Sequence, residues 1–468
     1  MMLLRRMKQY FFRRGKRTNY RMSGFTLIEA AVFLFIFSLI TVTFYEAWSV
    51  GTRNIMNAKY RLGATAIANQ QMEIIRSLIF DDIGTTGGIP NGTLAQDQSI
   101  TASNTVYQVH TVVQYVDDAT DGTLAAHTDI APNDYKQVTV TVSWGGASSS
   151  EQVSMVSVFS LDGVESVAAG TGVLSINILN NAGVGVSNAS VHIVNTAVSP
   201  QVNMTASTDT NGNLMFPGAP ASVSGYQLSV SKNGYYPNMT YSPYPTSAFN
   251  PVNTHTSVVA GGLTAATIVS DEHSDIDFRT QDPFGTDISN VDFSVSGGLV
   301  IGTDPATGAS VYDFSYSGST DGSGQHTFSD RSSGVYDVTL SSGETGYKYL
   351  RLNPEEVTFG TINLAPGETK SVTMVLADKT LNSALIVVND ASSNEPIQGA
   401  SVRIWNAALS YDVTVTADVY GQAYFPTSNT PLLAGTYDIE VTASGFATAT
   451  STVTIGSGLQ TKTMNLSL

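Results

Sequence analysis

An uncharged, strongly apolar run behind a basic leader is the feature that most limits how this chain can fold. No residue from Ala30 to Tyr45 is charged, and residues 1–24 carry eight lysines and arginines but no acidic residue. A helix over residues 25–45 is long enough to cross a bilayer. Basic residues stay on the cytoplasmic side of such a helix. We therefore expect a single membrane-spanning helix, with everything after Tyr45 outside the cytoplasm.

One acidic residue, Glu29, interrupts the apolar stretch, within the sequence Gly24-Phe25-Thr26-Leu27-Ile28-Glu29. An ionised carboxylate in lipid is unfavourable by several kcal/mol unless it has a partner. The opposite charge of a neighbouring subunit can supply that partner, because charges attract strongly in a medium of low dielectric constant. Glu29 is therefore the candidate contact that sets the register between subunits.

The hexapeptide resembles the class III signal of the type IV pilin and type II secretion pseudopilin superfamily. The resemblance implies that a membrane-embedded prepilin peptidase cuts between Gly24 and Phe25, and that the new N-terminal Phe25 is methylated. It also implies that Glu29 of one subunit neutralises the α-ammonium of Phe25 in the next. An ordinary signal peptide or anchor helix with an incidental acid is the alternative.

A long helix over residues 25–78, followed by a small β head over residues 79–168, is the predicted N-terminal module. Beyond Trp48 the helix becomes amphipathic, which indicates that its second half packs against other residues. Its apolar positions there are Ile55, Leu62, Ile67, Met72, Ile75 and Ile79. Glycines and Pro90 end the helix, and strand-like runs follow at Thr105–Val116, Lys136–Trp144 and Gln152–Leu161. A helix along a small antiparallel sheet resembles the pilin head.

Three landmarks recur about every 110 residues after residue 168, and this is domain spacing rather than solenoid spacing. They are a small-residue valine strand, an Asp–Gly turn before a phenylalanine, and a strand centred on a tyrosine. The turns begin at Asp209, Asp321 and Asp418, and the tyrosines are Tyr226, Tyr336 and Tyr437. The pattern predicts sandwiches over 169–268, 269–378 and 379–468, the middle one with a long excursion near residues 303–319. It resembles the carboxypeptidase regulatory-like domains, which are prealbumin-type, Ig-like sandwiches.

Charge and cysteine content exclude several classes of protein. Of the 22 lysines and arginines, eight precede Phe25, which leaves 14 against 38 acidic residues and a net charge near −24. Nucleic-acid binding needs clustered basic residues, so no nucleic-acid partner is expected. The chain has no cysteine, and apolar cores must therefore stabilise its domains without disulfides.

No catalytic signature is present, and an enzyme is not expected. Nucleophile elbows, phosphate-binding loops and zinc spacings among the six histidines are all missing. The candidate metal site is a calcium site in the acidic loop with Asp117, Asp118 and Asp121, for which a solvated turn is the simpler alternative. No other cofactor is expected. Asp271–Asp275 is interpreted as a solvated linker at the start of the middle sandwich. The aromatic stretch Tyr235–Pro245 either closes a sandwich edge, which we favour, or binds sugars or proteins.

The predicted fold class is an α+β pilin module, with a long N-terminal transmembrane helix and a small antiparallel sheet, followed by all-β sandwich domains. The predicted function is that of a minor pilin or pseudopilin, a subunit of a type IV pilus-like filament that displays Ig-like domains for adhesion. The alternative is a pseudopilin that primes assembly in type II secretion or DNA uptake. Expected partners are the prepilin peptidase, other pilin subunits, the inner-membrane assembly platform, the membrane, and a surface or carbohydrate ligand. The sandwiches would lie outside the cytoplasmic membrane, and outside the cell after assembly.

Overall fold

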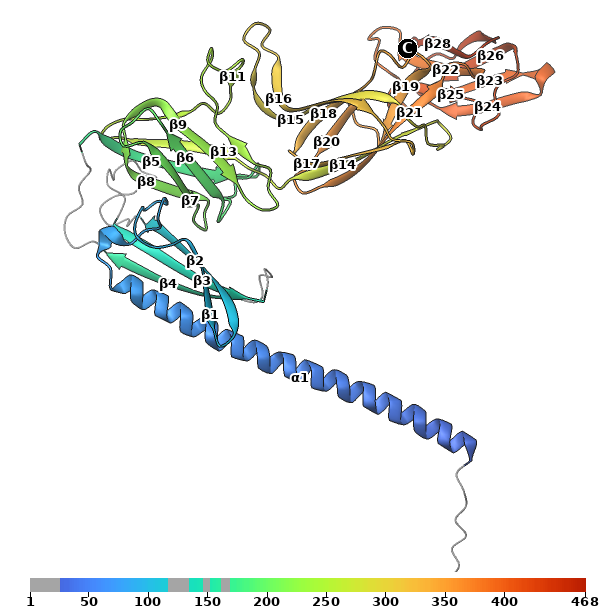
Figure 1. Ribbon diagram of the computed structural model, residues 1–468. Helices are drawn as coiled ribbons and strands as arrows, with labels where there is room; N and C mark the ends of the chain where they lie inside the picture. The colour runs from blue at the N-terminus through green and yellow to red at the C-terminus, as the bar shows by residue number, and fades with distance from the viewer. Residues whose placement is uncertain (1–25, 117–133, 146–151, 161–168) are drawn as a thin grey trace, which may run out of the picture. The chain divides into compact units, whose positions relative to one another are not determined.

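The computed structural model describes residues 26–116, 134–145, 152–160 and 169–468. It has one long N-terminal helix, α1 (Leu27–Arg76), a short 3-10 turn, η1 (Phe80–Asp82), and then β-strands (Figure 1). This arrangement confirms the predicted fold class. Contacts group the chain into two compact units. Of the described residues, the first unit holds 26–70, 99–109, 141–145 and 152–154, and the second holds the others, including all the sandwiches.

The second half of α1 is only partly buried. Ile67, Met72 and Ile75 are buried, as predicted, together with Ala64 and Ala68. Three other predicted members of that face, Ile55, Leu62 and Ile79, are 72%, 73% and 68% exposed, so that part of the prediction is wrong. Small residues explain the difference, because Gly63 and the alanines let the sheet approach closely. The Tyr107 ring lies over Gly63, where a Cβ atom would overlap its hydroxyl group.

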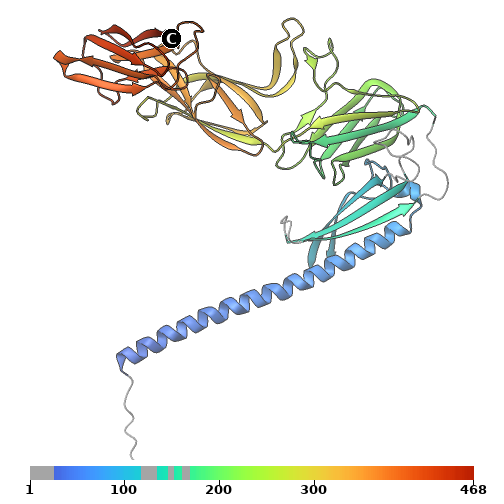
Figure 2. The same cartoon turned by 180° about the vertical axis from the view of Figure 1, so that it is seen from behind.

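Four antiparallel strands follow the helix in the order β1-β2-β3-β4, visible in Figures 1 and 2. They are β1 (Asp97–Ala102), β2 (Thr105–Val116), β3 (Tyr135–Trp144) and β4 (Gln152–Ser160). The sequence predicts the last three. It does not predict β1, whose residues are all exposed or half-buried and therefore carry no apolar pattern. In β3 every second side chain is buried, as its alternating sequence predicts.

Lys136 is a buried cation in β3, with only 3% of the residue exposed. Its Nζ atom donates a hydrogen bond to the carbonyl oxygen of Phe80 at 2.7 Å and lies 4.5 Å from the centroid of the Phe80 ring. Burial lowers the pKa of Lys136 to about 8, and the charges of Asp81 and Asp82 act in the opposite direction. The lysine thus connects η1 to β3 at a cost in desolvation.

We expect the stability of the wild-type head to rise between pH 8 and about pH 10 relative to that of a Lys136→Met variant. Folded Lys136 loses its proton near pH 8 and unfolded lysine near 10.5. The unfolded state therefore binds more protons in this window, and the free energy of unfolding increases with pH. The gain levels off as the pH approaches 10.5, because the unfolded lysine then loses its proton as well. Urea unfolding followed by Trp144 fluorescence, with Trp48 and Trp405 replaced by Phe, should show the difference growing by about 2 kcal/mol. A difference that stays constant with pH would contradict this account.

Three β-sandwiches form the described chain after residue 169, each with a hydrophobic core between two sheets. The first has sheets β13-β5-β8 and β10-β9-β6-β7, with β12 beside β9. Its strands are β5 (Thr171–Leu179), β6 (Ser190–Asn195), β7 (Val202–Ser207), β8 (Asn213–Pro220), β9 (Ser222–Ser231), β10 (Asn238–Met239), β12 (Thr256–Val258) and β13 (Leu263–Val269).

The second sandwich has sheets β17-β14-β21-β19 and β11-β15-β18-β20, with β16 beside β15. Its strands are β11 (Asn250–Pro251), β14 (Ser274–Gln281), β15 (Asp292–Thr303), β16 (Ser310–Ser319), β17 (Gln325–Arg331), β18 (Gly334–Leu340), β19 (Tyr347–Asn353), β20 (Thr361–Leu364) and β21 (Thr369–Asp378). The predicted excursion near residues 303–319 is the turn and the second strand of a long β15–β16 hairpin, and it is therefore part of the sheet.

The third sandwich has sheets β25-β22-β28 and β24-β23-β26-β27. Its strands are β22 (Ser383–Asp390), β23 (Ser401–Asn406), β24 (Tyr411–Thr416), β25 (Gln422–Phe425), β26 (Gly435–Thr442), β27 (Ala449–Ile455) and β28 (Leu459–Leu466), with the 3-10 turn η2 (Ala407–Leu409) between β23 and β24. The domain boundaries given above stay a prediction.

The first and last strands of every sandwich lie side by side and run parallel, apart from the two-residue β11, which precedes β14 in the second sandwich. β5 pairs with β13, β14 with β21, and β22 with β28, each in continuous register. The three sandwiches thus share one core topology, to which the second adds β19 beside β21, in agreement with the repeat read from the sequence.

The three Asp–Gly turns also share one local structure. In each turn the Asp carboxylate accepts the backbone N–H groups of the residues two and four positions later, at 2.8–3.0 Å. The glycine three positions after the Asp has a positive φ, which is +69° at Gly421. Glycine adopts such a conformation without steric cost, so these turns need their glycines.

The predicted core tyrosines are confirmed. Tyr226, Tyr336 and Tyr437 are at most 1% exposed. Each donates its hydroxyl hydrogen to a backbone carbonyl a few residues upstream, at Pro220 (2.7 Å), Ser332 (2.6 Å) and Leu433 (2.9 Å). Each therefore fills the core with its ring and satisfies its polar atom at a corner.

Candidate functional site

The first half of α1 presents apolar side chains around the whole helix. Every residue from Leu27 to Trp48 is exposed, and Leu27 is 87% exposed. By length and composition, α1 is apolar enough to cross a membrane. An apolar surface of this extent requires lipid or other apolar helices around it.

Glu29 caps the beginning of this helix. Its Oε2 atom accepts hydrogen bonds from the Thr26 backbone N–H at 3.0 Å and from the Thr26 hydroxyl at 2.9 Å. In return, the Thr26 Oγ1 atom accepts the Glu29 N–H at 3.2 Å. This reciprocal arrangement is a capping box, whose signal is Thr-x-x-Glu. The sequence contains that signal, but the register argument alone does not predict this contact.

The remaining predicted site residues lie outside the described residues. They are Gly24 and Phe25 of the processing signal, and Asp117, Asp118 and Asp121 of the candidate calcium loop. Cleavage, methylation and calcium binding therefore stay predictions.

A different cluster of potential metal ligands lies at the start of the second sandwich. His273, Asp275 and Asp330 offer ligand atoms within 4.8 Å of one another. Two of these contacts already have structural explanations. The Asp275 carboxylate accepts the Asp330 backbone N–H at 2.9 Å, and the His273 Nδ1 atom lies 3.3 Å from the Asp330 carboxylate. The segment 271–275 is also less solvated than predicted, because Ser274 is 2% exposed and begins β14.

The aromatic stretch Tyr235–Pro245 lies at the edge of the first sandwich, where most of its aromatic rings are half-buried. The Tyr241 ring packs against Phe249 with centroids 5.4 Å apart, and Tyr235 contacts Lys232. Tyr244 is the exception, at 52% exposed. These contacts favour the edge-closing interpretation of the stretch.

No protein-family model and no characterised protein sequence matches the chain. Among solved structures, it is similar to the TIE protein of Bacillus anthracis, at 13% identity and a TM-score of 0.21, over 79% of this chain and 73% of the other. It is also similar to a streptococcal ancillary pilin, at 12% identity and a TM-score of 0.19, over 63% of this chain and 98% of the other. A third likeness is to a minor pilin of Streptococcus agalactiae, at 14% identity and a TM-score of 0.17, over 42% and 95%. TM-scores this low do not establish a common fold.

Proposed function

We propose that this protein is a minor pilin or pseudopilin that displays its three sandwiches on a type IV pilus-like filament. The observation that carries the proposal is the exposed apolar half of α1, with a single acidic residue at its start. Such a helix can lie in the membrane before assembly and in a bundle of like helices afterwards. Both surroundings exclude water from the same side chains.

Glu29 sets the position of each new subunit in this proposal. Prepilin peptidase cleavage after Gly24 would give Phe25 a free α-ammonium group near the helix start. The described contacts of the Glu29 carboxylate use only Oε2, so Oε1 is available to the ammonium group of a neighbouring chain. Attraction between these charges in an apolar bundle favours one register over its neighbours.

Three sandwiches on every subunit would crowd a thin fibre, and we therefore place this chain at a tip or another rare position. Deleting residues 170–468 separates display from priming. Fibres that form but no longer attach to surfaces would indicate an adhesin. Loss of the fibres themselves would favour the priming component of a secretion or DNA-uptake system.

Substituting Glu29 tests the filament role directly. Glutamine can still close a capping box but has no charge, whereas alanine removes both functions. We expect Glu29→Gln and Glu29→Ala each to abolish recovery of the chain in sheared surface filaments, while both variants remain in the membrane fraction. Glu46→Ala, a change in the same helix outside the apolar run, is the matched control and should assemble normally.

Two outcomes would overturn the proposed role of Glu29. Normal assembly of Glu29→Ala would show that the carboxylate is dispensable. Assembly of Glu29→Gln but not Glu29→Ala would show that the helix cap, and not the charge, is what the filament needs.

A further inference from the structure

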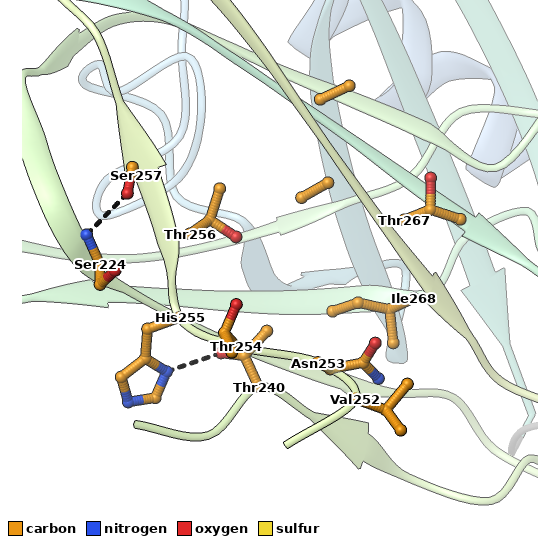
Figure 3. Close-up of a pocket in the computed structure, with 12 residues that line it drawn as sticks. Ser224, Thr240, Val252, Asn253, Thr254, His255, Thr256, Ser257, Thr267 and Ile268 are labelled. Atoms are coloured by element: carbon orange, nitrogen blue, oxygen red, sulfur yellow. Dashed lines mark hydrogen bonds between the residues drawn. The ribbon is translucent and has the colours of Figure 1, made fainter. Parts of the chain in front are cut away.

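The first sandwich contains a pocket of about 330 Å³, within the size range of small-ligand sites. One wall is the segment Val252–Ser257 and the other is strand β13. Figure 3 shows Thr254 and Thr256 on one side, and Thr267 and Ile268 on the other. Strand β13 and the residues from Thr254 to Ser257 belong to the first sandwich, whereas Val252 at one end of the pocket donates its N–H to the Ile301 carbonyl of the second sandwich at 3.0 Å.

Strand β13 turns an unpaired edge toward this pocket. On its other side it pairs with β5, where the Ser270 N–H bonds to the Leu179 carbonyl and the Gly262 carbonyl to the Val173 N–H, both at 2.9 Å. In a parallel strand, the backbone N–H and C=O groups of successive residues point alternately to one neighbouring strand and to the opposite edge. The backbone groups of the even-numbered residues between 262 and 270 therefore face β5. The backbone groups of Ala265 and Thr267 therefore face away from β5, along the pocket wall that these two residues form.

The edge is closed at one end. Val269 is the next residue whose backbone groups face away from β5. Its carbonyl oxygen already accepts a hydrogen bond from the Asn238 side chain at 2.7 Å. Only Ala265 and Thr267 then present outward backbone groups within the pocket. Two residues are a short edge for an extended peptide that binds by adding a strand.

Most of the side chains that line the pocket are polar, and the lining contains no lysine, arginine, aspartate or glutamate. Hydroxyl groups of Thr254, Thr256 and Thr267 and the amide of Asn253 line it. The His255 Nδ1 atom is 2.9 Å from the Thr240 hydroxyl, and burial lowers the pKa of His255. With Nδ1 engaged, Nε2 is the polar ring atom left for a ligand.

This chemistry selects among ligands. A charged ligand would find no counter-charge among the lining residues, and an apolar ligand would leave buried donors and acceptors unpaired. Hydroxyl groups donate and accept hydrogen bonds, so they match both the outward backbone groups of β13 and the threonine side chains. The exposed Val252 side chain offers apolar contact to C–H groups. We propose that this pocket binds a neutral saccharide of one or two rings. The inference rests on the proposed display function, because it names the ligand class that the displayed sandwich would recognise.

The test uses the purified full chain in detergent, applied to an array of neutral and sialylated mono- and disaccharides. We expect binding to neutral saccharides, confirmed by calorimetry with the best of them. Thr254→Val and Thr267→Val each remove one pocket hydroxyl at nearly constant volume, and each should weaken binding about tenfold. Thr452→Val, which removes an exposed hydroxyl in the third sandwich, is the matched control and should bind like the wild type.

Three results would overturn the proposal. They are no binding of any neutral saccharide, equal affinity of the pocket variants and the control, and binding of an alternating Ala–Thr hexapeptide in place of sugars. Saccharide binding should persist in Glu29→Ala, because the pocket does not require a filament. Failure of the filament role and failure of the pocket can therefore be told apart.

Discussion

Tyr437→Ala is expected to destabilise the third sandwich by about 3–5 kcal/mol, the usual cost of removing a large buried aromatic side chain. Tyr437 is 1% exposed, and its ring meets Tyr411 edge to face with centroids 5.5 Å apart. Its hydroxyl group also donates a hydrogen bond to the Leu433 carbonyl oxygen at 2.9 Å. The alanine variant loses this packing and leaves a cavity between the two sheets.

Tyr437→Phe distinguishes the contribution of the ring to stability from that of the hydroxyl group. It keeps the ring and should lose about 1 kcal/mol, the net value of a single hydrogen bond. Hydrogen exchange followed by mass spectrometry localises both effects, because peptides from residues 383–466 should lose protection while those from the first two sandwiches do not. Equal effects of Ala and Phe would mean that the corner hydrogen bond, and not core filling, dominates.

Gly421→Ala should destabilise the same sandwich by about 3 kcal/mol, the sum of backbone strain and overlap. Gly421 has a φ of +69°, and a Cβ atom there would overlap the Val388 carbonyl oxygen and lie 3.2 Å from Pro396 Cβ. That Val388 oxygen belongs to the central strand β22, so the backbone cannot move aside easily. The turn must open or the strand must shift.

Gly445→Ala is the matched control for this substitution. Gly445 has a φ of +85°, but no atom lies within 4 Å of its ideal Cβ position. It should therefore show only the strain of a positive φ, about 1–2 kcal/mol. Urea unfolding of the two variants, followed by hydrogen exchange of the third sandwich, measures the difference. If both lose the same stability, the close approach to Val388 contributes nothing.

The recurring sandwich features could be predicted because each depends on a local rule. An Asp followed three residues later by Gly fixes the turn, and a tyrosine in an alternating strand fills the core. Strand order has no comparable local signal. The pairing of β5 with β13 joins residues about 90 positions apart, and backbone hydrogen bonds form whatever the side chains are.

The functional features likewise divide into those that the local sequence predicts and those that depend on the three-dimensional fold. Glu29 could be singled out because a carboxylate beside an apolar run is unusual, whereas its contact with Thr26 depends on helix geometry. The pocket could not be predicted, because Thr254 and Thr267 are ordinary residues of β proteins and become a site only when the fold places the segment before β12 opposite β13. Ile55 and Leu62 fit an amphipathic pattern, yet the small residues after them, Gly63, Ala64 and Ala68, decide where the helix is covered.

The parallel pairing of first and last strands has a mechanical consequence. When the two ends of a sandwich are pulled apart, its terminal strands are drawn past each other along their length. The backbone hydrogen bonds between Ser383–Asp390 and Leu459–Leu466 then bear the tension together instead of opening one at a time. β5 with β13 and β14 with β21 have the same geometry, so a chain without cysteines can still resist extension at three successive points.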